Sequence, residues 1–436
     1  MSNISKNTFN TLFRQVIGVL IQLVTVVVIA RNLGVEENGL YGIAILLPTF
    51  MALLFSLGLN SSNIYFIGKK QYTLTTVYSS VILISIIIIL IAMFCGFFSI
   101  YFFSTSLFPN VDFDILLIAL CIFPFSFLYL LHLSFLQAIE DFSSYNIVSL
   151  VRPILFFCVI LLLYYFNNLT LRNVVLLSFV NSLISSFIAT YFVYRKNFSF
   201  KIIAISKKYI KHALTYGFKS HITNLIAFVN YRADMFLLNI FSTPIDVGIY
   251  YIGIQIVERL WILSSSMSTV LFPRFVKLQN DSKTRVLLIT KAFRIVFLLT
   301  SLISILLIIT GYYLIELIFG KQYIDAYVAI IILIPGVIFG AGSRILANSI
   351  AAKGKPELNM YTSLIVMVLN IILNILFIPI YGFVGAALAT SVSYSLNLVL
   401  RIWLIKRIEP FFYFKDLLIR KRDISFIYHK SIGFFK

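Results

Sequence analysis

The sequence is poor in the residues that many enzymes and metalloproteins use. It contains only three cysteines, Cys95, Cys121 and Cys158, which lie in apolar stretches without CxxC spacing. They therefore predict neither a disulfide framework nor a metal site. The four histidines form no HExxH pattern, and no GxxxxGK[ST] phosphate loop occurs, which argues against direct use of ATP. We expect no cofactor and no catalytic residues.

Acidic residues are also scarce, since 16 Asp and Glu stand against 35 Lys and Arg, for a formal net charge of +19. Charged residues make up 12% of the chain and hydrophobic residues 60%, a balance that soluble domains do not have. Because the basic residues gather in linkers between apolar segments, the charge indicates cytoplasmic loops and no nucleic-acid partner. The composition predicts an all-α polytopic membrane protein.

Apolar segments of about 20 residues, the length that a helix needs to cross a bilayer, recur along the whole chain. The first follows MSNISKNTFNTLFRQ without a small-residue cleavage site, so we expect an uncleaved first helix. We place about twelve spans near residues 10–30, 38–60, 77–103, 113–138, 146–166, 172–194, 212–240, 246–273, 288–314, 324–350, 357–379 and 382–406.

The loops predict the orientation of these spans. Those that follow even-numbered spans are rich in Lys and Arg, as at 69–70, 195–211, 274–285 and 353–355. The loop after the fourth span is the exception, because it carries Glu140 and Asp141. The opposite loops carry little more than Arg31, Arg172 and Lys321. The positive-inside rule therefore predicts a multi-pass protein with both termini in the cytoplasm.

The longest loop, 195–211, divides the chain into two halves of six spans. NGLYGIA (38–44) follows the first span much as VGIYYIG (247–253) follows the seventh, which suggests a parallel repeat. We therefore expect an N-terminal lobe at 1–200 and a C-terminal lobe at 201–408. A basic, aromatic tail at 409–436 is either an interfacial helix that attracts anionic lipid or a solvated segment.

The stretch 212–275 contains charged residues inside two predicted spans. A charged side chain at the bilayer centre costs about 2.5–3.5 kcal/mol, so such residues usually face a polar interior. We interpret the cluster as part of a ligand-facing cavity. Alternatively, Arg232–Asp234 and Glu258–Arg259 are charges near helix ends that pair across an interface.

Five segments of the chain can be compared with a known family of membrane proteins by their sequences and their order. They are ARNLGVEENGLYGIAILLPTF, YRADMFLLNIFSTPIDVGIYYIG, LFPRF, IFGKQYIDAYVAIIILIPG and AAKGKPELNM with NIILNILFIPIYGFVGAALATSVSY. Together with the span count, they resemble the Wzx-type polysaccharide flippases of the multidrug/oligosaccharidyl-lipid/polysaccharide exporter superfamily. The resemblance covers essentially the whole chain.

The resemblance implies two six-helix lobes around a central cavity in the bacterial cytoplasmic (inner) membrane. It implies an undecaprenyl-pyrophosphate-linked oligosaccharide as substrate, moved to the outer leaflet for O-antigen, lipopolysaccharide, capsule or exopolysaccharide assembly. Membrane lipids, a polysaccharide polymerase and a chain-length regulator are the expected partners.

A lipid pyrophosphate needs a cationic, hydrogen-bonding path through the membrane. The candidate substrate-binding cations are Arg14, Lys219, Arg232, Arg259 and Arg344. The candidate amides for sugar hydroxyls are Gln15, Gln22, Asn230 and Gln255. Asp234 and Glu258 are candidates for proton or cation coupling, although either can instead neutralise a neighbouring arginine.

Four other functions remain open. The lipid II flippases of the same superfamily have charged residues where this chain has Gly39, Ala52 and Thr25, and only Arg259 falls on their cavity arginine. They also typically have fourteen spans. A cation-coupled drug exporter fits the basic interior less well. A polytopic polymerase fits the short outer loops less well. A non-transporting scaffold fits the charges inside the predicted spans less well.

Overall fold

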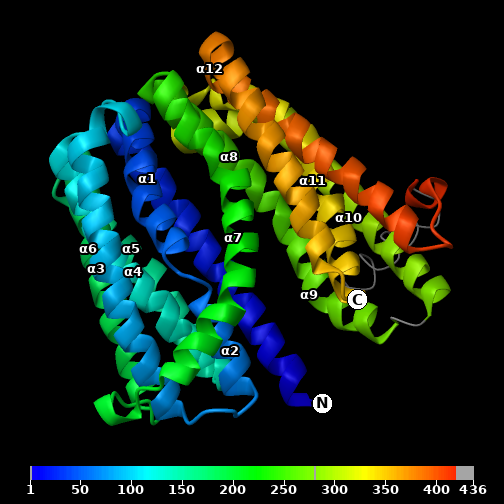
Figure 1. The fold of residues 1–436 in the computed structure, drawn as a ribbon. Helices are drawn as coiled ribbons and strands as arrows, with labels where there is room; N and C mark the ends of the chain where they lie inside the picture. The colour runs from blue at the N-terminus through cyan, green and yellow to red at the C-terminus, as the bar shows by residue number, and fades with distance from the viewer. Residues whose placement is uncertain (1, 279–280, 419–436) are drawn as a thin grey trace. The chain divides into compact units, whose positions relative to one another are not determined.

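The computed structural model describes residues 2–278 and 281–418, in which the regular structure is entirely helical (Figure 1). The chain forms two compact units, Met1–Leu225 and Ile226–Lys436. The boundary between them falls within one helix, α7 (Lys207–Phe241). The all-α fold predicted from the composition is confirmed.

The N-terminal unit is built from long apolar helices joined by short loops. In chain order they are α1 (Ser2–Leu54), α2 (Leu59–Gly68), α3 (Leu74–Leu107), α4 (Phe113–Ala138), α5 (Phe142–Tyr165), α6 (Leu171–Tyr194), the 3₁₀ turn η1 (Ile202–Ala204) and the first part of α7. Side-chain oxygens cap several of these helices, as Thr73 and Thr170 do for α3 and α6. Such caps accept hydrogen bonds from first-turn amides that have no partner inside the helix.

The C-terminal unit begins with the rest of α7. It continues through α8 (Pro244–Glu258), η2 (Arg259–Trp261), α9 (Ile262–Lys277), α10 (Ser282–Phe319), η3 (Lys321–Tyr323), α11 (Ala326–Ala352), α12 (Pro356–Ile408) and η4 (Phe414–Leu417). The 3₁₀ turn η2 therefore interrupts the predicted span 246–273, which would otherwise be one helix.

The predicted spans do not correspond one to one with the helices. Within the described ranges, nine helical segments are long and apolar enough to cross a membrane. Two of them, Ile17–Leu54 and Pro356–Ile408, each contain two predicted spans. Gly34 (φ 78°) and Gly382 (φ 53°) interrupt the helical backbone where those spans meet. The more polar α7 supplies the remaining predicted span, so the structure accounts for all twelve.

Each unit has its own packed interior. In the N-terminal unit α4 packs against α6 and α1, and α1 packs against α5. The buried face of α6 carries small residues, including Ser182, Ser186 and Ala189, which allow the helices to approach closely. By contrast, Leu90, Phe94 and other large apolar side chains of α3 are exposed, as expected for a surface that faces lipid.

Helix α11 is the centre of the C-terminal unit, because it contacts α8, α9, α10 and α12. The glycines of its PGVIFGAG segment permit these contacts. A Cβ at Gly336 would lie 2.6 Å from the Cα of Ser391 in α12, and one at Gly342 would lie 2.5 Å from the ring of Phe293 in α10. These glycines therefore allow α10 and α12 to pack closely against α11.

The first residues after α12 are held by α10 and α11. Glu409 is 1% exposed and forms ion pairs with Arg285 and Lys353. It also accepts a 2.5 Å hydrogen bond from the Ser282 hydroxyl. The predicted tail at 409–436 thus begins with a docked segment, and its residues 419–436 lie outside the described part of the chain.

Candidate functional site

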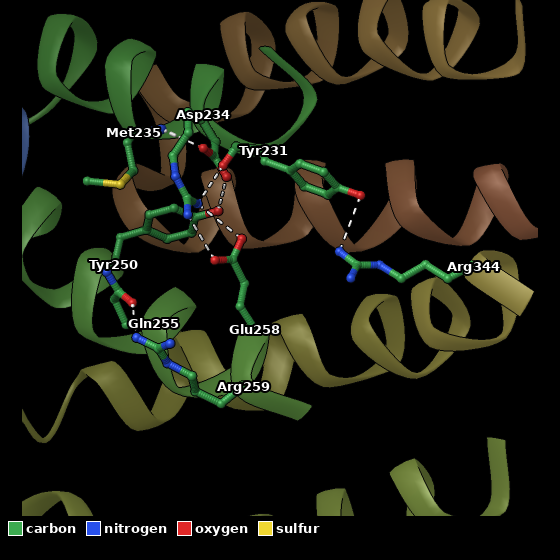
Figure 2. A network of polar contacts seen from close by, with 9 residues as sticks. Tyr231, Asp234, Met235, Tyr250, Gln255, Glu258, Arg259 and Arg344 are labelled. Carbon is green, nitrogen blue, oxygen red and sulfur yellow. Dashed lines mark hydrogen bonds and ion pairs between the residues drawn. The ribbon is translucent and has the colours of Figure 1, made fainter. Parts of the chain in front are cut away.

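Most of the charged residues that the sequence singled out in its central stretch lie in one polar network of the C-terminal unit. They come from α7, α8 and η2, and Arg344 of α11 joins them (Figure 2). Among residues 2–278 and 281–418, no cluster of side chains has the composition of a metal site. The network consists of arginines, carboxylates, aromatic residues and the amide of Gln255 (Figure 2).

Arg232 and Glu258 form its central ion pair. Arg232 Nη1 lies 3.0 Å from Glu258 Oε1, and Nη2 lies 3.0 Å from Oε2. Such a two-pronged geometry is the strongest that arginine makes with a carboxylate. Arg232 Nη1 also donates to the carbonyl of Tyr231, at 2.8 Å. The pair connects α7 to the end of α8 and neutralises both charges.

Asp234 has a different environment, although it lies only two residues from Arg232. It is 1% exposed, and its Oδ1 accepts a 2.8 Å hydrogen bond from the amide of Met235. Its Oδ2 accepts hydrogen bonds from the hydroxyls of Tyr250 in α8 and Thr390 in α12. Asp234 thus connects three helices through a carboxylate that no arginine contacts directly within hydrogen-bond distance in the described residues.

In the alternative considered above, the Arg232–Asp234 and Glu258–Arg259 charges pair across an interface, and the structure contains one such pair between two helices. Glu258 pairs with Arg232 across two helices, whereas Arg259 donates from Nη2 to Gln255 Oε1 at 3.3 Å. The reason is geometric, because consecutive residues of a helix point in directions about 100° apart and do not face each other. Arg259 forms no ion pair with any carboxylate in the described part of the chain.

Arg344 of α11 is the second cation of the network without a carboxylate among the described residues. Its guanidinium lies 4.0 Å from the centre of the Trp261 ring and donates to the Tyr231 hydroxyl at 3.4 Å. Tyr231, Trp261 and Tyr394 form an aromatic cluster with ring centres 5.2–6.0 Å apart. Cation–π contacts of this kind hold an arginine in place while leaving its charge uncompensated.

The remaining candidates are not brought into this network. Asn230 donates to the carbonyl of Ser363 at 2.9 Å, so it connects α7 to α12. Gln22 lines a separate cavity inside the N-terminal unit. Arg14 is half-buried in α1. The side chains of Gln15 and Lys219 lie outside the described residues.

The sequence analysis missed two arginines inside predicted spans, the buried Arg401 and the half-buried Arg152. Arg401 of α12 donates to the carbonyl and hydroxyl of Ser343, at 3.1 and 2.9 Å. Arg152 of α5 lies in the wall of the same cavity as Gln22. Each is a charge inside a predicted span, so the criterion that singled out Arg232 would have found both.

Comparisons with known proteins agree with this architecture. The family described as polysaccharide biosynthesis protein matches residues 4–279. A putative O-antigen transporter of Shigella flexneri is 24% identical over 417 residues, which cover 93% of this chain and 98% of that protein. The probable low-salt glycan biosynthesis flippase Agl15 of Haloferax volcanii is 27% identical over 177 residues, which cover 38% of this chain and 36% of that protein.

Among solved structures, the lipid II flippase MurJ in an inward closed conformation superposes with a TM-score of 0.77 and 19% identity. The match covers 94% of this chain and 89% of that one. At this identity it establishes the fold alone. Together, these matches confirm the resemblance that was predicted from the order of the sequence segments.

Proposed function

Because this chain belongs to the polysaccharide biosynthesis protein family, we propose that it is a flippase for undecaprenyl-pyrophosphate-linked oligosaccharides. In this proposal it moves the lipid-linked repeat unit from the cytoplasmic to the outer leaflet of the cytoplasmic membrane. The product supplies O-antigen, capsule or exopolysaccharide assembly. The near full-length match to a putative O-antigen transporter supports this substrate class.

The observation that carries the proposal is the surplus of positive charge in the polar network. Arg232 is neutralised by Glu258, but Arg259 and Arg344 have no carboxylate partner in the described part of the chain. An uncompensated arginine within apolar helices is energetically unfavourable and marks a ligand site. A pyrophosphate offers several anionic oxygens, and its charge-assisted hydrogen bonds are about twice as strong as neutral ones.

The mechanism in this proposal requires binding and conformational change but no covalent step. Arg259 and Arg344 hold the pyrophosphate, while Gln255 and the aromatic cluster of Tyr231, Trp261 and Tyr394 offer hydrogen bonds and flat surfaces to the sugars. The polyprenyl chain stays in the lipid. Transport then depends on a change that favours one accessible state over the other.

Asp234 is the residue we propose for coupling that change to an ion gradient. Its carboxylate lies where α7, α8 and α12 meet, so a change in its charge alters the contacts of all three helices. Glu258 was an equal candidate from sequence, but its carboxylate is already occupied by Arg232. We therefore propose that Glu258 contributes less to coupling than Asp234 does.

The experiment that tests the function follows the lipid-linked glycan in cells without this protein. We expect surface polysaccharide to disappear and undecaprenyl-pyrophosphate glycan to accumulate on the cytoplasmic face, where an added glycosidase in inside-out vesicles reaches it. Restoring the wild-type chain should reverse both effects. Accumulation of lipid II instead, or an unchanged surface polysaccharide, would contradict the proposed substrate.

A further inference from the structure

The N-terminal unit contains a partly open cavity of about 390 Å³ that the polar network of the C-terminal unit does not involve. Helices α1, α4, α5 and α6 all contribute to its wall. Pockets for small organic ligands typically have volumes of about 300–1,000 Å³, so the space suits a ligand of this kind.

One cation lies in the wall of this cavity. Arg152 donates from Nη2 to the Ser182 hydroxyl at 3.3 Å, and its guanidinium lies 4.7 Å from the centre of the Tyr129 ring. The Tyr129 hydroxyl is itself held by the carbonyl of Val148, at 3.3 Å. Arg152 forms no ion pair with a carboxylate in the described part of the chain. The hydrogen bond to Ser182 uses one of its five N–H donors, which leaves donors for an anionic ligand.

The rest of the polar wall presents acceptors. The hydroxyls of Thr49, Ser126, Ser149 and Ser178 each donate to a carbonyl three or four residues earlier in their own helix, at 2.9–3.1 Å. Because a hydroxyl has one hydrogen and two lone pairs, each of these oxygens remains able to accept. The buried Oδ1 of Asn181 has no hydrogen-bond partner at all in the described residues.

Two prolines add to this imbalance. Pro48 of α1 and Pro153 of α5 both line the cavity. A proline inside a helix has no N–H, so the carbonyl four residues earlier loses its usual donor. The wall is therefore rich in acceptors, and its side-chain donors besides Arg152 include the amides of Gln22 and Asn181.

This pattern selects among ligands by their donors and acceptors. A chloride ion would pair with Arg152 but has no hydrogen to donate to the acceptors, and a hydrogen phosphate dianion has only one. A neutral sugar would donate to the acceptors but leave the arginine without a counter-charge. A sugar acid satisfies both, because its carboxylate matches the guanidinium and its hydroxyls supply the missing donors.

We propose that this cavity is a binding site for an acidic monosaccharide unit, with its carboxylate on Arg152 and its hydroxyls on Asn181 and the serine and threonine oxygens. The inference rests on the proposed function in one respect, since it specifies that the translocated glycan contains such a sugar. It therefore narrows the substrate from any lipid-linked oligosaccharide to one that carries a uronic acid or a similar sugar acid.

The test is a binding measurement on the purified full-length protein in detergent, with D-glucuronate as the probe. Isothermal titration should show binding of glucuronate, and at least about tenfold weaker binding of D-glucose, acetate and inorganic phosphate. Replacing Arg152→Gln should weaken glucuronate binding at least about tenfold, and Arg152→Lys should retain an intermediate affinity because lysine lacks the bidentate fork. The matched control is Arg172→Gln, an exposed arginine of the same unit that pairs with Asp114, and it should leave the affinity unchanged.

A second variant keeps the test decisive if Arg152→Gln does not fold. Asn181→Asp nearly preserves the shape of the side chain but adds a negative charge to the cavity wall, so glucuronate binding should be lost while the protein elutes as wild type on size exclusion. Equal affinity for glucuronate, acetate and phosphate would overturn the proposal in favour of a simple anion site. Undiminished glucuronate binding by both variants would also overturn it.

Failure of the glucuronate-binding test and failure of the flippase proposal can be distinguished, because binding of free glucuronate needs no translocation. If the wild-type chain restores surface polysaccharide but binds no glucuronate, the acidic-sugar site is refuted and the flippase remains. If it binds glucuronate through Arg152 but restores no polysaccharide, the flippase proposal is refuted and the site remains. A free sugar acid and a lipid-linked one are distinguished by whether a purified acidic lipid-linked glycan displaces glucuronate.

Discussion

Arg232 and Glu258 lie 26 positions apart in the sequence, yet both oxygens of the carboxylate are 3.0 Å from the two terminal nitrogens of the guanidinium. Among the described residues, the pair leaves Arg259, the immediate neighbour of Glu258, as a cation whose hydrogen-bond partner is the amide of Gln255 and not a carboxylate. Arg232 thus has a structural role in the ion pair, whereas Arg259 is available for a ligand. It also decides what a double substitution should do.

Replacing Arg259→Ala should reduce surface polysaccharide at least about tenfold at normal protein level, because a hydrogen bond to a charged group contributes about 1.5–3 kcal/mol. Arg259→Lys should recover part of the export. Since Glu258 is neutralised by Arg232, adding Glu258→Gln to Arg259→Ala should restore nothing. Quantified surface glycan in a complemented deletion strain measures this. Rescue by the double variant would mean that Glu258 and Arg259 act as a pair.

Replacing Asp234→Asn should change how transport responds to ion gradients. The substitution keeps the shape of the side chain but removes the charge shared by α7, α8 and α12. We expect export to lose its dependence on the proton or sodium gradient, measured with selective ionophores. Tyr250→Phe, which removes one hydrogen bond and no charge, is the matched control and should retain that dependence. The coupling proposal is wrong if Asp234→Asn and Glu258→Gln both respond to the gradients as wild type does.

Asp141 should make the stability of the N-terminal unit depend on acid pH. Burial would raise the pKa of Asp141, but hydrogen bonds from Lys196 and Ser144 outweigh that effect and hold it below its ordinary value. The folded state therefore gains stability from the carboxylate above its unfolded pKa of about 3.9, and loses it as the pH falls through the lower folded pKa. Because both partners are partly exposed, the gain is at most about 1 kcal/mol.

The measurement compares thermal unfolding of wild type and Asp141→Asn in detergent between pH 7 and pH 3. Asparagine still caps α5, so the comparison isolates the charge. The wild type should be more stable at neutral pH, and the two melting curves should converge in acid. A difference that is constant with pH would show that the Lys196 contact does not act through charge.

The orientation can be tested by labelling single cysteines in a background where Cys95, Cys121 and Cys158 are replaced by serine. Each site lies at a helix end or in a loop of the structure. Three positions should react with an impermeant maleimide in intact cells: Ser104, Asn168 and Lys321. Three should react only after permeabilisation: Lys69, Lys201 and Lys283. The reverse pattern would overturn the prediction of cytoplasmic termini, and outside labelling at Lys201 alone would break the division into two six-span halves.

The number of membrane-spanning segments could be predicted from the sequence, but the helix boundaries could not. Hydropathy finds spans by length, whereas a break such as Gly34 or Gly382 depends on a single positive φ that composition does not reveal. Similarly, η2 interrupts an apolar run with no glycine or proline at the break. Such tight turns follow from packing against neighbouring helices, which a single span does not encode.

The sequence identified the unusual charged residues of the site, but it did not show which of them pair with one another. Intramembrane charge identified Arg232, Glu258 and Arg259 as unusual, yet which carboxylate faces which arginine depends on the rotation of α7 against α8. Trp261 and Tyr394 escaped notice because aromatic residues are frequent throughout this chain. Trp261 lies under Arg344 and packs against Tyr394, an arrangement that is visible only when η2, α11 and α12 are seen together.

The docked segment after α12 has a consequence for the order in which the protein is made. Arg285 enters α10 early in the synthesis of the C-terminal unit, whereas its counter-ion Glu409 is translated 124 residues later. Until then, the Arg285 guanidinium of α10 lacks the carboxylate that neutralises it in the buried interior of the folded unit, and the partly exposed Lys353, directly after α11, lacks the same partner. The C-terminal unit therefore completes its assembly only after its last span has left the ribosome, and a chain that stops before Glu409 never acquires the carboxylate that unites these helices.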